Sequence, residues 1–219
     1  MTGRQVLAIG RTAVALAASL VIAGCAGASA APSNGGAGAP AGCPTSQPAP
    51  LSAGQTRSVT VHTAQGTIVI RVEASLSPVA AGNFVALASC GYYDGVVFHR
   101  VVPGFVIQGG DGQFGRADRL GAHVGAGGPG YTIADEPVTA TYGRGVVAMA
   151  RSSQPHSEGS QFFIVLSDEA RESLESANTY AIFGHVTSGM EVADAIAAAA
   201  DAEIPSHPVA MDAVTVANP

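Results

Sequence analysis

Two short segments hold the side chains of this chain that could do chemistry together. One runs from Phe98 to Asp111 and reads FHRVVPGFVIQGGD, and the other runs from Gly159 to Val165 and reads GSQFFIV. They place one arginine, Arg100, among phenylalanines and valines. Such a site suits a reaction that breaks no covalent bond, such as rotation about an X-Pro peptide bond, whose barrier is about 18–20 kcal/mol. An apolar pocket and one charged donor could lower it by the roughly 5–7 kcal/mol that enzyme rates require.

Together with several shorter motifs, these segments resemble the cyclophilin family of peptidyl-prolyl cis-trans isomerases. The resemblance runs from about Ser58 to Val216, nearly all of the chain after its N-terminal quarter. The other matching motifs are Asn83-Phe84, Gly91-Tyr92-Tyr93-Asp94-Gly95, Ala148-Met149-Ala150, Phe183-Gly184-His185-Val186 and Gly189-Met190. The resemblance implies a mainly β fold, a closed eight-stranded antiparallel barrel capped by two α-helices, and an isomerase that needs no cofactor.

Arg100 would carry the chemistry. A guanidinium stays charged at any relevant pH and offers a planar fork of donors. When the amide twists, its nitrogen gains a lone pair, and a donor placed there favours the transition state over both planar ground states. In isolation Arg100 would be a solvated strand arginine, whereas the resemblance implies the family's catalytic arginine. His99 alternates to the opposite strand face, so we expect it to be a buried structural histidine.

The resemblance also implies the residues that bind the substrate. Phe105, Val106 and Phe163 would line the pocket for the proline ring, with Val106 in place of the methionine common there. Gln108 matches the family's active-site glutamine, and period-two spacing puts it on the strand face of Val106. Gln161 matches a position in the binding groove. Without the resemblance, these residues would be read as core or as ordinary strand positions.

Two parts of the groove depart from the family pattern. Ala150 and Arg151 match a segment whose backbone meets the residue before proline, where Arg151 replaces a common asparagine. Arg151 would add positive charge and favour acidic or small residues there, or it is simply exposed. In 167–179 the chain lacks the tryptophan of many eukaryotic members. Leu174 takes the leucine position and Tyr180 the histidine position, and cyclosporin A should bind more weakly.

The glycine-rich stretch Gly125–Gly130 formally satisfies G-x-G-x-x-G. Pro129 and the residues after it do not open a helix, so a dinucleotide site is excluded. The resemblance makes this stretch the loop that borders the active groove. Ser160 lacks the nucleophile-elbow pattern of a serine hydrolase.

Composition excludes several other kinds of function. All ten basic residues are arginine, which rules out a Schiff base or a P-loop lysine. The formal net charge of −6 makes nucleic acid a poor partner. The six histidines show no ligand spacing, so no metal is expected. With 219 residues, 47% of them hydrophobic, we expect one globular domain and a monomer.

The N-terminus reads as a lipoprotein signal peptide over residues 1–25. Two arginines precede the apolar run Thr12–Ala23, which is too short to span a bilayer. The run ends in Ile22-Ala23-Gly24-Cys25, which resembles a bacterial lipobox, so Cys25 would be lipidated and anchor the protein outside the cytoplasm. The alternative is cleavage after Ala28-Ser29-Ala30, which releases a soluble secreted protein.

Residues 26–56 are rich in Gly, Ala, Pro and Ser, which predicts a flexible tether before a domain over residues 57–219. If Cys25 carries lipid, Cys43 and Cys90 remain, and they could form a disulfide in an oxidising compartment. Cys90 could equally be a small buried residue at a helix end.

Periodicity predicts mostly strands. The segments Arg57–His62 and Thr67–Glu73 alternate around a turn and predict a hairpin. Ser77-Pro78 predicts the N-cap and first turn of a helix that ends near Cys90. The remaining predicted elements are strands at Val96–Val101, Phe105–Gln108, Val146–Ala150, Gln161–Leu166, Tyr180–Val186 and Val209–Val216, and a second helix at Glu191–Ala199.

Two functions follow from this reading. The first is an isomerase that accelerates X-Pro rotation in exported proteins as they fold. The second is a lipid-anchored module that binds Pro-containing segments, or a holdase for unfolded chains, with incidental turnover. Arg100 favours the enzyme, because a pure binding module would not need it.

Overall fold

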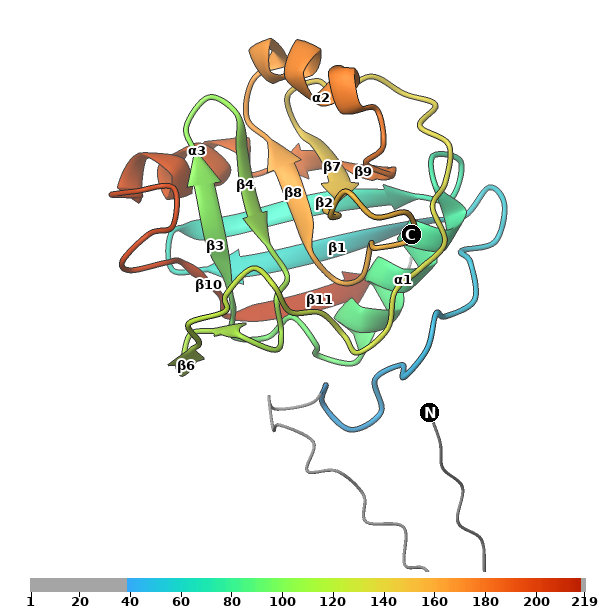
Figure 1. The fold of residues 1–219 in the computed structure, drawn as a ribbon, viewed down its shortest axis with the longest axis horizontal. Helices are drawn as coiled ribbons and strands as arrows, with labels where there is room; N and C mark the ends of the chain where they lie inside the picture. Colours follow the sequence, from blue (N-terminus) through green and yellow to red (C-terminus); the bar gives the residue numbers. More distant parts are fainter. Residues whose placement is uncertain (1–38, 218–219) are drawn as a thin grey trace, which may run out of the picture. The chain divides into compact units, whose positions relative to one another are not determined.

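The computed structural model describes residues 39–217, and Figure 1 shows their strands and helices. Every predicted strand is present, together with two very short strands that were not predicted. In chain order the elements are β1 (Thr56–Thr63), β2 (Gly66–Glu73), α1 (Pro78–Ser89), β3 (Val96–Val102), β4 (Val106–Gly109), β5 (Gly115–Arg116), β6 (Arg119–Leu120), β7 (Val146–Met149), β8 (Phe162–Val165), the 3₁₀ helix η1 (Asp168–Ala170), α2 (Arg171–Ala177), β9 (Ile182–Ser188), α3 (Met190–Ala199), β10 (Ala210–Met211) and β11 (Ala213–Ala217).

The C-terminal segment closes the sheet into a barrel. Hydrogen-bonded neighbours follow the order β11-β1-β2-β9-β7-β8-β4-β3, and every pair in it is antiparallel. β10 pairs with β3 through Met211 and Val96, while β11 pairs with β1. Only Asp212 separates β10 from β11, and its N–H donates to the carbonyl of His62 in β1 over 2.8 Å. One segment therefore joins both ends, which confirms the eight-stranded barrel.

Apolar side chains of alternating strand residues fill the barrel. Val59, Val61, Ile68 and Ile70 of the first hairpin are buried, and the exposed or half-buried residues lie between them. This alternation is what places one face of each strand in the core.

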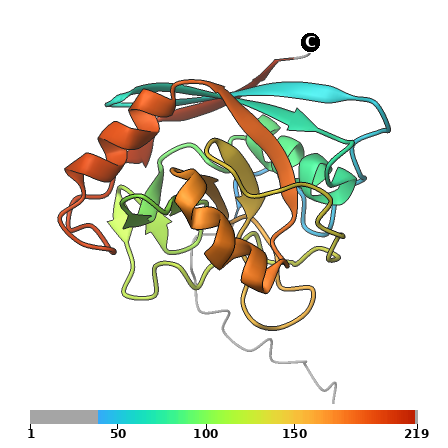
Figure 2. The same ribbon diagram turned by 90° about the horizontal axis from the view of Figure 1, so that it is seen from above.

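Two helices cover different sides of the barrel, α1 and α3, as Figures 1 and 2 show. Phe84 of α1 reaches into the core, where its ring centroid lies 5.2 Å from that of Tyr93, 5.1 Å from Phe162 and 4.7 Å from Phe183. Such tilted and edge contacts are favourable for aromatic rings. Phe162 of the second motif thus packs against α1.

The start of α1 differs from its prediction in one detail. Ser77 does occupy the N-cap, but its side chain makes no capping hydrogen bond. Instead, the two carboxylate oxygens of Glu136 accept from the backbone N–H groups of Val79 over 2.9 Å and Ala80 over 2.8 Å. A carboxylate there satisfies free N–H groups and complements the helix dipole.

The described part of the chain has a third α-helix, α2, in a segment where we predicted none. η1 leads into α2, and Asn178 ends it in a left-handed conformation with φ of 44°. α2 has seven residues, of which only Leu174 is buried. So short a helix has no repeated apolar spacing, and tertiary packing of Leu174 stabilises it instead. The two predicted helices are α1 and α3, and α2 is an additional short helix that was not predicted.

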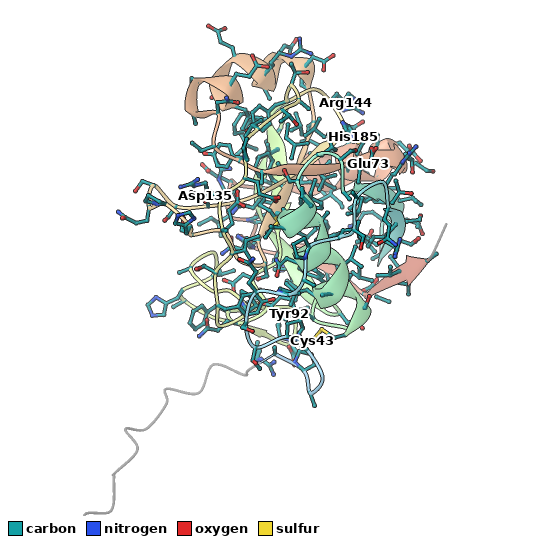
Figure 3. The ribbon with its side chains drawn as sticks, turned by 90° about the vertical axis from the view of Figure 1, so that its right-hand side faces the viewer. Cys43, Glu73, Tyr92, Asp135, Arg144 and His185 are labelled. Carbon is teal, nitrogen blue, oxygen red and sulfur yellow. A yellow bond between two sulfur atoms is a disulfide. The ribbon has the colours of Figure 1, made fainter. Side chains whose placement is uncertain are left out.

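The tether predicted over residues 26–56 is also corrected, because residues 39–56 pack on the domain. Cys43 and Cys90 form a disulfide with a Cα–Cα distance of 5.2 Å. The N–H of Leu51 donates to the carbonyl of Pro78 over 2.9 Å, and Leu51 is buried. A segment poor in apolar residues is held here by a covalent bond and backbone hydrogen bonds, which composition does not reveal. Figure 3 shows the disulfide of Cys43 beside α1.

One glycine permits this packing. A Cβ on Gly82 of α1 would lie 2.4 Å from the carbonyl oxygen of Ala49, so only glycine lets the segment approach the helix. The signal peptide, Cys25 and residues 26–38 of the tether lie outside the described residues. None of the described helices is long and apolar enough to span a membrane.

Candidate active site

Three neighbouring strands present the predicted site residues on one face. Arg100 of β3 pairs with Gln108 of β4, and Gln108 pairs with Phe163 of β8. Residues directly opposite each other in a sheet point to the same side. The register shifts between Phe98 and Arg100, and this irregularity sets which face Arg100 occupies. The strand face that Val106 and Gln108 share in β4 therefore continues onto Arg100 of β3 and Phe163 of β8.

Nine of the ten predicted site residues line one cavity of about 210 Å³. Its floor is formed by the apolar side chains of Val106, Phe163 and Leu174, which are buried, at 2%, 3% and 4% exposed. Tyr180 meets Phe163 edge to face, with ring centroids 5.4 Å apart. The lining residues are Arg100, Phe105, Val106, Gln108, Ala150, Arg151, Phe163, Leu174 and Tyr180. A cavity of this size and polarity can hold a small apolar ring beside a charged donor.

The tenth residue, Gln161, connects this cavity to the glycine-rich loop. Gln108 Nε2 donates to Gln161 Oε1 over 3.0 Å. Gln161 Nε2 in turn donates to the carbonyls of Gly125 over 2.9 Å and Gly127 over 2.8 Å. Gln161 and Gln108 also line a neighbouring cavity of about 550 Å³. The two glutamines thus mark the boundary between the two cavities.

Asp111 holds the loop in shape, and sequence reasoning missed this role. Its Oδ1 accepts from the N–H groups of Gln113 and Phe114, and its Oδ2 accepts from those of Gly125 and Gly127, at 2.8–3.1 Å. The carboxylate is fully buried. Two of its four charge-assisted bonds fix the start of the stretch Gly125–Thr132, which lines the larger cavity. The position of Asp111 as the last residue of the first motif was the available signal.

Arg151 lines both cavities of the groove and is not the exposed arginine of the alternative prediction. Its side chain is 9% exposed, so it is not a solvated arginine. Its Nη1 lies 3.1 Å from Asp135 Oδ1, and its Nη2 donates to the carbonyl of Gln154 over 2.8 Å. Asp135 therefore compensates much of the positive charge that Arg151 brings to the groove.

Two buried titratable groups lie close to the site. His99 is 4% exposed, which agrees with the predicted structural role, and burial lowers its pKa. Neither of its ring nitrogens has a hydrogen-bond partner within residues 39–217. Burial raises the pKa of Glu158 to about 7. Its Oε1 accepts from the N–H of Ala181 over 3.0 Å, and no sequence signal had singled it out.

Glu203 is another acidic residue beside the site, and its Oε1 accepts a hydrogen bond from Arg100 Nε over 2.7 Å.

Within the described residues, no cluster of three or more His, Cys, Asp or Glu side chains could hold a metal ion. The site offers an apolar floor, the two guanidinium groups of Arg100 and Arg151 and the two amides of Gln108 and Gln161. This set can bind and polarise a peptide, and it contains no activated nucleophile.

Comparisons with known proteins identify the class. A family model described as "Cyclophilin type peptidyl-prolyl cis-trans isomerase/CLD" matches residues 58–216. Peptidyl-prolyl cis-trans isomerase B of Escherichia coli is 34% identical over 171 residues, covering 73% of this chain and 99% of the relative. A probable peptidyl-prolyl cis-trans isomerase of Brucella abortus is 38% identical over 141 residues, which cover 63% of this chain and 70% of the relative.

Solved structures agree with this class. The crystal structure of a cyclophilin type peptidyl-prolyl cis-trans isomerase from Cryptosporidium parvum matches with a TM-score of 0.62 and 29% identity, covering 75% of this chain and 99% of that one. A second structure of that protein, determined in the presence of the dipeptide Ala-Pro, matches with a TM-score of 0.61. The chain belongs to the cyclophilin family. It is a peptidyl-prolyl cis-trans isomerase.

Proposed function

We propose that this isomerase accelerates X-Pro rotation in exported polypeptides, with Arg100 as its catalytic residue. The observation that carries the proposal is the cavity of about 210 Å³, where Arg100 shares the lining with the buried side chains of Val106, Phe163 and Leu174. The proline ring would bind on this apolar floor. The peptide bond before it would then lie beside the guanidinium.

The mechanism needs no covalent intermediate. In the planar amide, resonance withdraws the nitrogen lone pair, so the nitrogen is a poor acceptor. Twisting localises the lone pair on nitrogen, and a terminal N–H of Arg100 can then donate to it. This hydrogen bond exists only near the transition state, so it raises the rate rather than binding the ground states. The apolar floor excludes water, which strengthens the charge-assisted bond.

Residues before the proline would extend over the neighbouring cavity of about 550 Å³. Gln108 and Gln161 lie between the two cavities and can orient the peptide backbone. A preference for acidic or small residues before proline stays a prediction. Asp135 should limit the acidic preference, because its carboxylate lies beside Arg151.

The cellular location of the protein, outside the cytoplasm, is also proposed. The apolar run before Cys25 supports export and lipid attachment, with release as a soluble protein as the alternative. The Cys43–Cys90 disulfide supports the same compartment, because disulfides persist outside the cytoplasm. Mass spectrometry of the membrane fraction should find a diacylated N-terminus at Cys25. An N-terminus at Ala31 without lipid would favour secretion instead.

The role of Arg100 is tested by a protease-coupled assay on an X-Pro tetrapeptide series. Arg100→Ala should lower kcat/KM about 30- to 1,000-fold, the loss of roughly 2–4 kcal/mol in the transition state. The fold should stay intact, because Arg100 lies outside the core. Arg100→Lys should recover little, since a flexible point charge lacks the planar fork.

A different result would favour the second function. If Arg100→Ala kept more than about a third of the wild-type kcat/KM, the loss would be below about 1 kcal/mol and the catalytic role would be wrong. The protein would then act mainly by binding Pro-containing segments or unfolded chains. Matching far-UV circular dichroism of the two proteins is the control for folding.

A further inference from the structure

We propose that Glu203 is a positioning residue that holds the guanidinium of Arg100 ready for the twisting amide. The inference rests on the catalytic role proposed for Arg100. Arg100 Nε donates to Glu203 Oε1 over 2.7 Å, and the two side chains are 35% and 61% exposed. Within residues 39–217, Arg100 has no other side-chain hydrogen bond. Its two terminal nitrogens therefore keep their donors for the peptide.

The backbone of Glu203 is fixed beside Arg100 as well. The N–H of Val101 donates to the carbonyl of Glu203 over 2.8 Å, and Val101 directly follows Arg100 in β3. The carboxylate therefore reaches Arg100 from a backbone that is bonded to the same strand. This separates the pair from ordinary surface ion pairs, in which two long side chains meet without such support.

The segment around Glu203 is held at several points. Asp201 Oδ1 accepts from the N–H of Ser206 over 2.9 Å, which closes a turn around Glu203. Pro205 is buried, and the N–H of Phe98 donates to the carbonyl of Val209 over 2.9 Å. The turn that carries Glu203 is thus packed against β3 and does not depend on Arg100 for its shape.

The carboxylate has two opposite effects on Arg100. It restricts a side chain that otherwise loses considerable rotamer freedom each time it reaches the peptide. It also places a negative charge near a guanidinium whose positive charge favours the transition state. The charge effect is weakened by water, because Glu203 is more than half exposed. The hydrogen bond to Nε acts at contact distance, so we expect orientation to prevail.

The test is the kcat and KM of position 203 variants on an Ala-Pro tetrapeptide, using the mature chain. Glu203→Ala should lower kcat/KM about three- to tenfold, mainly through kcat. Glu203→Gln keeps an acceptor without the charge and should lose no more than about twofold. Glu191→Ala removes an exposed carboxylate at the start of α3 and is the control with the same change in net charge.

A double-mutant cycle separates positioning from a structural effect. In the Arg100→Ala background, Glu203→Ala should change kcat/KM less than twofold, because no guanidinium remains to position. An equal loss in both backgrounds, an unchanged activity of Glu203→Ala or a gain in either variant would overturn the proposal. If Arg100→Ala itself stayed active, the proposed function would fail first and separately.

Discussion

Gln161 accepts a hydrogen bond from Gln108 and donates two more to the glycine-rich loop. The distances are 3.0 Å to Gln108 and 2.9 Å and 2.8 Å to the carbonyls of Gly125 and Gly127. Its single amide therefore links the strand that carries the proline pocket to the wall of the larger cavity. A substrate that spans both cavities crosses this link.

Gln161→Ala should loosen the loop more than it harms the rotation step. Each lost hydrogen bond is worth about 1 kcal/mol, while the four bonds of Asp111 still hold the loop, so kcat/KM should fall about three- to tenfold. Most of the change should be in KM for peptides with long segments before proline. Gln154→Ala is the control, because the side chain of this exposed glutamine makes no hydrogen bond within residues 39–217. A pure kcat effect would contradict the prediction.

Glu158 should make stability fall as the pH rises. Its pKa is raised from 4.5 to about 7, mainly by burial and in smaller part by the nearby carboxylate of Asp135, while the hydrogen bond from the N–H of Ala181 opposes the change. Because the folded state binds the proton more tightly than the unfolded state, this stabilisation is complete below pH 4.5 and is lost as the pH rises through about 7. At about 1.4 kcal/mol per pKa unit, the decrease is ~3 kcal/mol.

The measurement is denaturant unfolding of the wild type and Glu158→Gln between these pH values. The glutamine variant lacks the titration, so the difference in the free energy of unfolding isolates Glu158 from the other groups. The wild type should lose stability relative to the variant with rising pH. A difference that does not change with pH would show that Glu158 titrates normally.

Breaking the Cys43–Cys90 disulfide should destabilise the domain without removing activity. The bond closes a loop across 47 positions, and bridges of this kind typically stabilise a protein by about 2–4 kcal/mol. Neither cysteine lines the cavity of Arg100. Chemical unfolding with and without reductant measures the loss in the free energy of unfolding. The stability of the Cys43→Ala, Cys90→Ala double variant should not change with reductant. A wild type whose unfolding ignores reductant would contradict the prediction.

Cyclosporin A should bind this protein more weakly than it binds tryptophan-containing members of the family. The chain has no tryptophan, and the segment that carries it in many eukaryotic members is α2 here, with Leu174 facing the cavity. Losing one donor to the ligand should lower affinity by about 1–2 kcal/mol, roughly tenfold. Isothermal titration calorimetry against such a member decides this, and equal affinities would show the prediction wrong.

The sequence by itself determined the strands, whereas the residues expected to line the proline pocket came from its resemblance to the family. Val106, Gln108 and Phe163 lie in two short motifs, and strand alternation decides which of their neighbours share a face. Local signals also predicted α1 and α3, because a Pro at the first turn and repeated apolar spacing are properties of neighbouring residues. These features depend on interactions within about ten residues, and a single sequence contains them directly.

Only the tertiary structure decided how the site is supported. Glu203 lies 103 positions from Arg100, and Glu136 lies 57 positions from the helix N–H of Val79 that it caps. Residues 39–56 and α2 are likewise held by distant partners rather than by their own composition. Closure of the barrel brings these residues together, because β10 and β11 pair with strands from the first half of the domain. No local pattern encodes which acidic side chain such a closure places beside which cation.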